Sequence, residues 1–176
     1  WLRGILADDY GVAIDRIRWV TFEEAHVAEF RDPPSVERAP EGKELTAMLL
    51  AGEIDAAILP AVPNDPRFKS VIPNPAAAAE TWRRKYGAIQ INHMVAVKES
   101  LSKSNPDSVR EIYRLLAESK KAAKLPKPGE VDTNPFGFEA NRRNLEVVID
   151  TVYRQKMIPR RFAVEELFDD VTRKLS

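Results

Sequence analysis

The chain has no cysteine, and only 7 of its 176 residues are glycine. Without cysteine, disulfides, thiolate zinc sites and a cysteine nucleophile are all excluded. The sequence contains no G-x-G-x-x-G or G-K-[ST] phosphate loop, no G-x-S-x-G elbow and no H-E-x-x-H motif. Nucleotide-cofactor, serine-hydrolase and zinc-protease chemistry therefore has no support, and we expect neither a cofactor nor a bound metal.

An excess of charge of either sign is also absent, because 27 basic and 27 acidic residues cancel. A nucleic-acid surface normally has a basic excess that neutralises phosphates, so we expect no nucleic-acid partner. No apolar run approaches the roughly 18 residues that a membrane-spanning helix needs, so we expect no membrane partner.

The first half of the chain alternates between helical and strand-like patterns. Apolar spacing predicts helices over residues 1–10 and 76–86, and another around Leu45, Met48 and Leu49 that ends at Gly52. Short β-rich runs predict strands, and a proline-containing stretch predicts a loop between the first strand and the second helix. The strands are expected at residues 17–22, 55–59 and 89–98, and the loop at residues 30–42.

From Leu101 onward the pattern is helical only. Asn105-Pro106-Asp107 and Asn134-Pro135 are predicted helix starts, and a last short helix is expected around Val164 to Val171. Strands separated by helices favour an α/β lobe with a mostly parallel sheet. Three strands offer little surface to three amphipathic helices, so we expect a second lobe outside this chain. In its absence, a second copy, as in a homodimer, or a swapped element would cover the exposed apolar surface.

Asn92 and His93 interrupt the apolar run of residues 89–98, and His93 is one of only two histidines. Burying such polar groups without a partner costs roughly 1–3 kcal/mol. Two interpretations are open: a hydrogen-bonded histidine in the core, or a residue that contacts a ligand.

Several segments, in order, resemble the 4,5-dihydroxyphthalate decarboxylase family. The first is Trp1-Leu2-Arg3-Gly4-Ile5-Leu6 with Tyr10-Gly11-Val12, which resembles W-x-R-G-x-L-x-x-x-Y-G-V. The others are Ile17-Arg18-Trp19, Leu50-Ala51-Gly52-Glu53-Ile54-Asp55-Ala56, Ile91-Asn92-His93-Met94 and Val164-Glu165-Glu166-Leu167-Phe168. The family is similar in fold to type 2 periplasmic binding proteins, which hold ligand between two α/β lobes. The resemblance implies that residues 1–88 form the second lobe, 89–98 a strand crossing between lobes, and 99–176 a helical segment packing on an N-terminal lobe that is missing here.

The resemblance also implies roles for four residues. The first helix would point its N-terminus at the ligand, where backbone N–H groups and the helix dipole favour an anion. Trp1 and Arg3 would then bind substrate, since a guanidinium can donate two parallel hydrogen bonds to a carboxylate. Asn92 would line the cleft, and His93 would donate a proton to the ring carbon or hold a phenolic oxygen.

Two further groups have competing interpretations. Glu23, Glu24 and His26 are potential metal ligands, but their spacing fits no tight pattern and a solvent-facing loop is favoured. Trp82 and Tyr86 lie four residues apart on a predicted helix, so we expect them to pack together.

The resemblance implies a cofactor-independent decarboxylase of a dihydroxylated aromatic dicarboxylate. The alternative is a solute-binding protein that holds a small anionic ligand in the same cleft without chemistry. We expect a small anionic aromatic ligand for the enzyme. The enzyme would be cytoplasmic and the solute-binding protein periplasmic.

Overall fold

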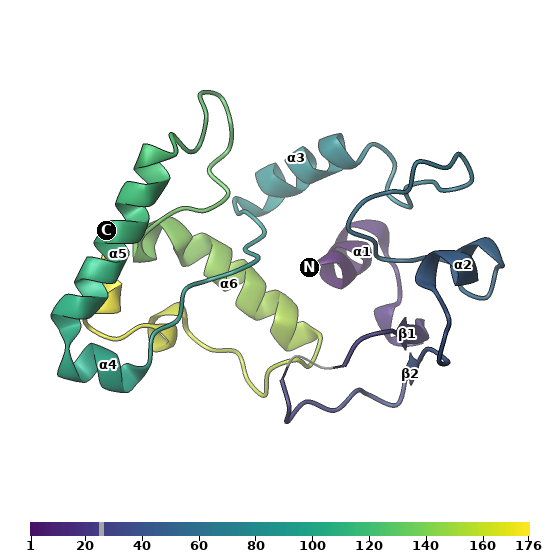
Figure 1. The fold of residues 1–176 in the computed structure, drawn as a ribbon, viewed down its shortest axis with the longest axis horizontal. Helices are drawn as coiled ribbons and strands as arrows, with labels where there is room; N and C mark the ends of the chain where they lie inside the picture. The colour runs from purple at the N-terminus through teal and green to yellow at the C-terminus, as the bar shows by residue number, and fades with distance from the viewer. Residues whose placement is uncertain (25–26) are drawn as a thin grey trace. The chain divides into compact units, whose positions relative to one another are not determined.

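The computed structural model describes residues 1–24 and 27–176 (Figure 1). Within these ranges, the chain has six α-helices and one two-stranded parallel sheet, which makes it α/β. It divides into two compact units, an N-terminal unit (Leu2–Ala79) and a C-terminal unit (Trp1 with Glu80–Ser176). The division therefore falls inside a helix, before the boundary between residues 88 and 89 that the sequence suggests. Every helix in the described ranges is too short or too polar to cross a bilayer.

The N-terminal unit contains helices whose ends follow local rules. Its elements are α1 (Leu2–Tyr10), the 3-10 turn η1 (Ile14–Arg16), β1 (Trp19–Thr21), β2 (Val36–Arg38) and α2 (Leu45–Leu50). Gly11 and Gly52 follow α1 and α2 with φ of +65° and +70°, a conformation that glycine adopts without a Cβ clash. Both predicted helices are confirmed, including where they end.

The sheet is only partly as predicted. β1 lies inside the predicted strand 17–22 and pairs in parallel with β2, with Trp19 opposite Val36 and Thr21 opposite Arg38. β2 lies inside the stretch predicted as a loop, so that prediction is wrong. The prolines flank the strand instead of interrupting it, and its backbone N–H groups remain able to bond.

Two other predicted strands, at residues 55–59 and 89–98, form no ladder with any described residue. Both strand predictions are therefore wrong for this structure. A strand needs a neighbouring strand to bond its N–H and C=O groups, and neither segment has one within the described ranges.

Helices dominate the C-terminal unit. α3 (Pro75–Tyr86) enters it, and α4 (Glu99–Ser104), α5 (Pro106–Ala122), α6 (Phe138–Arg154), η2 (Val164–Leu167) and η3 (Thr172–Lys174) follow. α5 starts as predicted, because the Asn105 side chain accepts a hydrogen bond from the Ser108 N–H at 3.1 Å. Asn134-Pro135 does not start α6, which begins at Phe138 after Gly137, so that predicted start is wrong. The Asn134 carbonyl instead accepts a hydrogen bond from the Lys120 ammonium at 2.6 Å. The last predicted helix, around Val164 to Val171, is wrong as an α-helix, because only the 3-10 turn η2 forms within that range and η3 follows it.

The hydrophobic core of this unit lies along α6. Phe138, Leu145 and Ile149 occupy one face of the helix at spacings of seven and four residues, and they pack with Val164. All four are buried, and burial of each side chain contributes about 1.5–3 kcal/mol. Half-buried residues that complete the cluster are Ile91, Val148, Ile158 and Phe168.

Polar side chains of α6 hold the segment that follows α3. Arg143 donates from Nε to the Tyr86 carbonyl at 2.8 Å, and the Asn144 Oδ1 accepts from the Ile89 N–H at 2.9 Å. Ile91 then packs into the core. Residues 86–91 are therefore held along α6, although they belong to no sheet.

We expect Asn144→Ala to lower the free energy of unfolding by about 1–3 kcal/mol, because it leaves the Ile89 N–H without its partner beside a buried helix. Urea unfolding followed by circular dichroism measures the change. Asn64→Ala is the control, since Asn64 is exposed in the N-terminal unit. Equal midpoints for the two variants would contradict the anchoring role of Asn144.

Candidate functional site

Three aromatic rings cluster where α3 meets the segment after it. The Trp1 indole Nε1–H donates to the Ile91 carbonyl at 2.6 Å, and its ring meets Trp82 edge-on at 5.7 Å between centroids. Trp82 is buried and packs on Tyr86 at 4.8 Å, which confirms the predicted pair. The cluster ties the first residue of the chain to the start of the Ile91–Met94 motif.

Asn92 and His93 directly follow the carbonyl that Trp1 binds. Both side chains are exposed, as are the next three residues of the segment. The interpretation of His93 as a hydrogen-bonded core residue is therefore wrong for this structure. The chain leaves the α6 core after Ile91, so no burial cost falls on the imidazole. Trp1 is thus bound to the residue that precedes Asn92 and His93, and all three belong to the C-terminal unit.

Arg3, the fourth predicted site residue, belongs to the N-terminal unit. It is half-buried in the first turn of α1, and its guanidinium lies 5.6 Å from the centroid of the Trp19 ring on β1. A cation over an indole face is attracted by the ring quadrupole, which orients the side chain without neutralising its charge. Its role as a carboxylate ligand stays a prediction.

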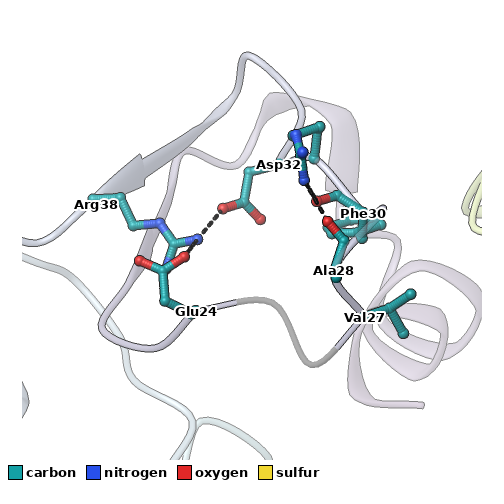
Figure 2. Close-up of a pocket in the computed structure, with 7 residues that line it drawn as sticks. Glu24, Val27, Ala28, Phe30, Asp32 and Arg38 are labelled. Atoms are coloured by element: carbon teal, nitrogen blue, oxygen red, sulfur yellow. Dashed lines mark hydrogen bonds and ion pairs between the residues drawn. The ribbon is translucent and has the colours of Figure 1, made fainter.

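A cavity of about 330 Å³ lies beside β2 in the N-terminal unit. Figure 2 shows Arg38 pointing at two carboxylates, Glu24 and Asp32, with N–O distances of 3.0 and 2.9 Å. Arg31, which also lines the cavity, donates to the carbonyls of Ala28 and Phe30. Two guanidiniums and two carboxylates cancel, so this cavity offers a dianionic ligand no net attraction.

The same cavity bears on the metal hypothesis. Glu24 is bound to Arg38, and His26 lies outside the described residues. Across residues 1–24 and 27–176, no group of three or more histidine or acidic side chains is arranged to hold a metal ion. The sequence analysis did not identify Arg38 as a site residue. The short Val36-Glu37-Arg38 run between prolines is the feature that could have indicated it.

The Val164–Phe168 motif packs against α6 and forms ion pairs with nearby arginines. Val164 is buried in the core, Glu165 forms an ion pair with Arg142, and the Glu166 carboxylate binds Arg160 at 2.6 and 3.0 Å. Glu166 also accepts from the Ala163 N–H at 2.7 Å. The Arg160 guanidinium, followed by this N–H, lowers the pKa of Glu166 to about 2.

Because the pKa of Glu166 is lower in the folded chain than the usual value of about 4.3, its carboxylate stabilises the fold above about pH 4.3 and loses this effect as the pH falls toward 2. We expect Glu166→Gln to be less stable than the parent chain at pH 6, with a clearly smaller gap at pH 3, where part of the effect has been lost. Urea midpoints at both values measure it. Glu41→Gln is the control, since Glu41 is exposed and forms no ion pair with the described residues. A gap that is equal at both pH values would contradict the assignment.

No family model matches the chain. Two curated relatives do, and both are named 4,5-dihydroxyphthalate decarboxylase. The protein from Comamonas testosteroni is 27% identical over 141 residues, which are 70% of this chain and 41% of the relative. The protein from Pseudomonas putida is 32% identical over 96 residues, which are 48% of this chain and 37% of the relative. The chain thus spans about two fifths of the length of the curated relatives it matches. It is a distant relative of the 4,5-dihydroxyphthalate decarboxylases.

Proposed function

We propose that this chain is part of a carboxy-lyase that releases carbon dioxide from a dihydroxylated aromatic dicarboxylate. The observation that carries the proposal is the similarity to two curated relatives with that name. The alternative from the sequence, a solute-binding protein, has no support in either relative. We also propose the cytoplasmic location that is expected of the enzyme.

The reaction makes three demands on a site. The bond between ring carbon and carboxylate carbon breaks, its electron pair stays on the ring, and a proton replaces the departing carbon dioxide. A group must therefore donate that proton, and others must hold the remaining carboxylate and partly desolvate the substrate. In our proposal His93 donates the proton, Arg3 binds a carboxylate, and Trp1 and Asn92 position the ring.

The exposure of His93 and its neighbours is consistent with a site completed by other parts of a longer protein. Residues 92–96 are exposed and bond to no strand within the described ranges, so a second lobe has open access to them. The Trp1 indole is held beside this segment, because it donates a hydrogen bond to Ile91, the residue before Asn92. We propose that residues 89–98 cross between two lobes, with residues 1–88 in one lobe and 99–176 packing on the other.

In the intact gene product, His93→Gln should keep the affinity for 4,5-dihydroxyphthalate and lower kcat by about 10²–10⁴-fold, because the proton donor is lost. Carbon dioxide release under saturating substrate measures kcat, and calorimetry measures affinity. His26→Gln is the matched control at the only other histidine. If kcat is unchanged in His93→Gln, or falls equally in both variants, His93 is not the proton donor.

Arg3→Ala should weaken the binding of phthalate by roughly 2–4 kcal/mol, the loss expected for a desolvated, charge-assisted bidentate contact. Arg3→Lys should recover only part of this, since an ammonium lacks the planar fork. Arg16→Ala is the control, because Arg16 is an exposed arginine of the same unit. Unchanged phthalate affinity in Arg3→Ala would remove Arg3 from the site.

A further inference from the structure

The cavity beside β2 in the N-terminal unit separates its charged groups into two places. Its volume of about 330 Å³ is at the lower end of the range of about 300–1,000 Å³ that is typical of small-molecule sites. Figure 2 shows Arg38 and Glu24 on one side of Asp32, and Ala28 and Phe30 on the other side. The charges of the lining side chains sum to zero, but their positions decide which ligand they attract.

The end of the cavity near Arg38 carries an excess of negative charge. The Arg38 guanidinium binds both Glu24 and Asp32, and its remaining acceptor is the neutral carbonyl of Glu23. Two carboxylates thus share one guanidinium, which leaves one net negative charge at this end. Asp32 binds Arg38 through Oδ2, and its Oδ1 accepts no hydrogen bond in the described part of the chain. An ammonium group can therefore bind this end through Asp32 Oδ1 and the Glu24 carboxylate, whose side chain is 91% exposed.

The other end of the cavity carries the positive charge of Arg31. Its Nη1 donates to the carbonyls of Ala28 and Phe30 at 2.6 and 2.9 Å, so the guanidinium is oriented by neutral groups that leave its charge in place. Among the described residues, Arg31 forms no ion pair, and its Nε and Nη2 donate no hydrogen bond. Two adjacent N–H donors are therefore available to a carboxylate, which guanidinium binds through parallel hydrogen bonds.

We propose that this cavity binds a small zwitterion, an α-amino acid with an apolar side chain. Its ammonium group binds Asp32 and Glu24, and its carboxylate binds Nε and Nη2 of Arg31. Its side chain covers Val27 and Phe30, which line the cavity and are exposed, so that apolar area leaves water. A ligand with one charge of each sign matches both ends, whereas a simple anion or cation matches only one. The proposal uses none of the residues assigned to decarboxylation, so the two can fail separately.

The test uses the 176-residue chain labelled with ¹⁵N and titrated with L-leucine at pH 6, where the α-amino group is charged. We expect saturable shifts of amide signals of residues 27–38 and of the Arg31 Nε–H signal. L-Leucinamide lacks the carboxylate and 4-methylpentanoate lacks the ammonium group, so each should bind about tenfold more weakly than L-leucine. Shifts that do not saturate, or an analogue that binds as tightly as L-leucine, would overturn the proposal.

Two substitutions should each affect one end of the ligand. Arg31→Gln should weaken L-leucine binding about tenfold without weakening L-leucinamide, because only L-leucine has a carboxylate for the guanidinium. Glu24→Gln should weaken L-leucine and L-leucinamide about threefold without weakening 4-methylpentanoate, because it removes the excess negative charge.

The probe that each variant still binds shows that its cavity is folded. Arg67→Gln is the control, since Arg67 pairs with Asp65 in the same unit and does not line the cavity. If Arg31→Gln leaves L-leucine binding unchanged, or weakens L-leucine and L-leucinamide equally, the proposed site is wrong.

Discussion

The packing of α6 is the constraint on which the rest of the C-terminal unit depends. The helix buries Phe138, Leu145 and Ile149, and this burial fixes which way Asn144 faces. Asn144 then binds the backbone of Ile89, so the chain that leaves α3 must run along α6. The carbonyl of Ile91 is in turn the acceptor for the Trp1 indole. The place of the Asn92-His93 pair is therefore set by a helix about fifty residues further along the chain.

The segments that resemble the decarboxylase family fall into two physical classes. The Val164–Phe168 segment is structural, because Val164 is buried while Glu165 and Glu166 bind arginines. The Ile91–Met94 segment begins in the core and then becomes exposed at Asn92. Similarity in the first class maintains the fold, since those side chains have no other evident task. Packing does not explain the similarity at Asn92 and His93, because both side chains are exposed. The proposed chemistry therefore uses these two residues.

The zero net charge of the chain conceals an uneven local distribution. Around Arg38 two carboxylates are close to one guanidinium, whereas around Asp150 two guanidiniums share one carboxylate. A dehydrated anion responds to the local field within a few ångströms, because more distant charges are screened by water and salt. Composition alone therefore gives the average charge of the chain and says nothing about the local charge around Arg38 or Asp150.

The sequence by itself determined the features that depend on a few neighbouring residues. Glycine after α1 and α2, the Asn105 cap of α5 and the Trp82–Tyr86 pair all act within one helical turn, so local rules are enough to predict them. Tertiary structure decided whatever needs a distant partner. β2 forms because β1 is beside it, and the predicted strands at 55–59 and 89–98 form no ladder because no described strand lies beside them. Likewise, the exposure of His93 and the ion pair between Asp150 and Arg161 follow from packing around α6, which no pattern within one helical turn encodes.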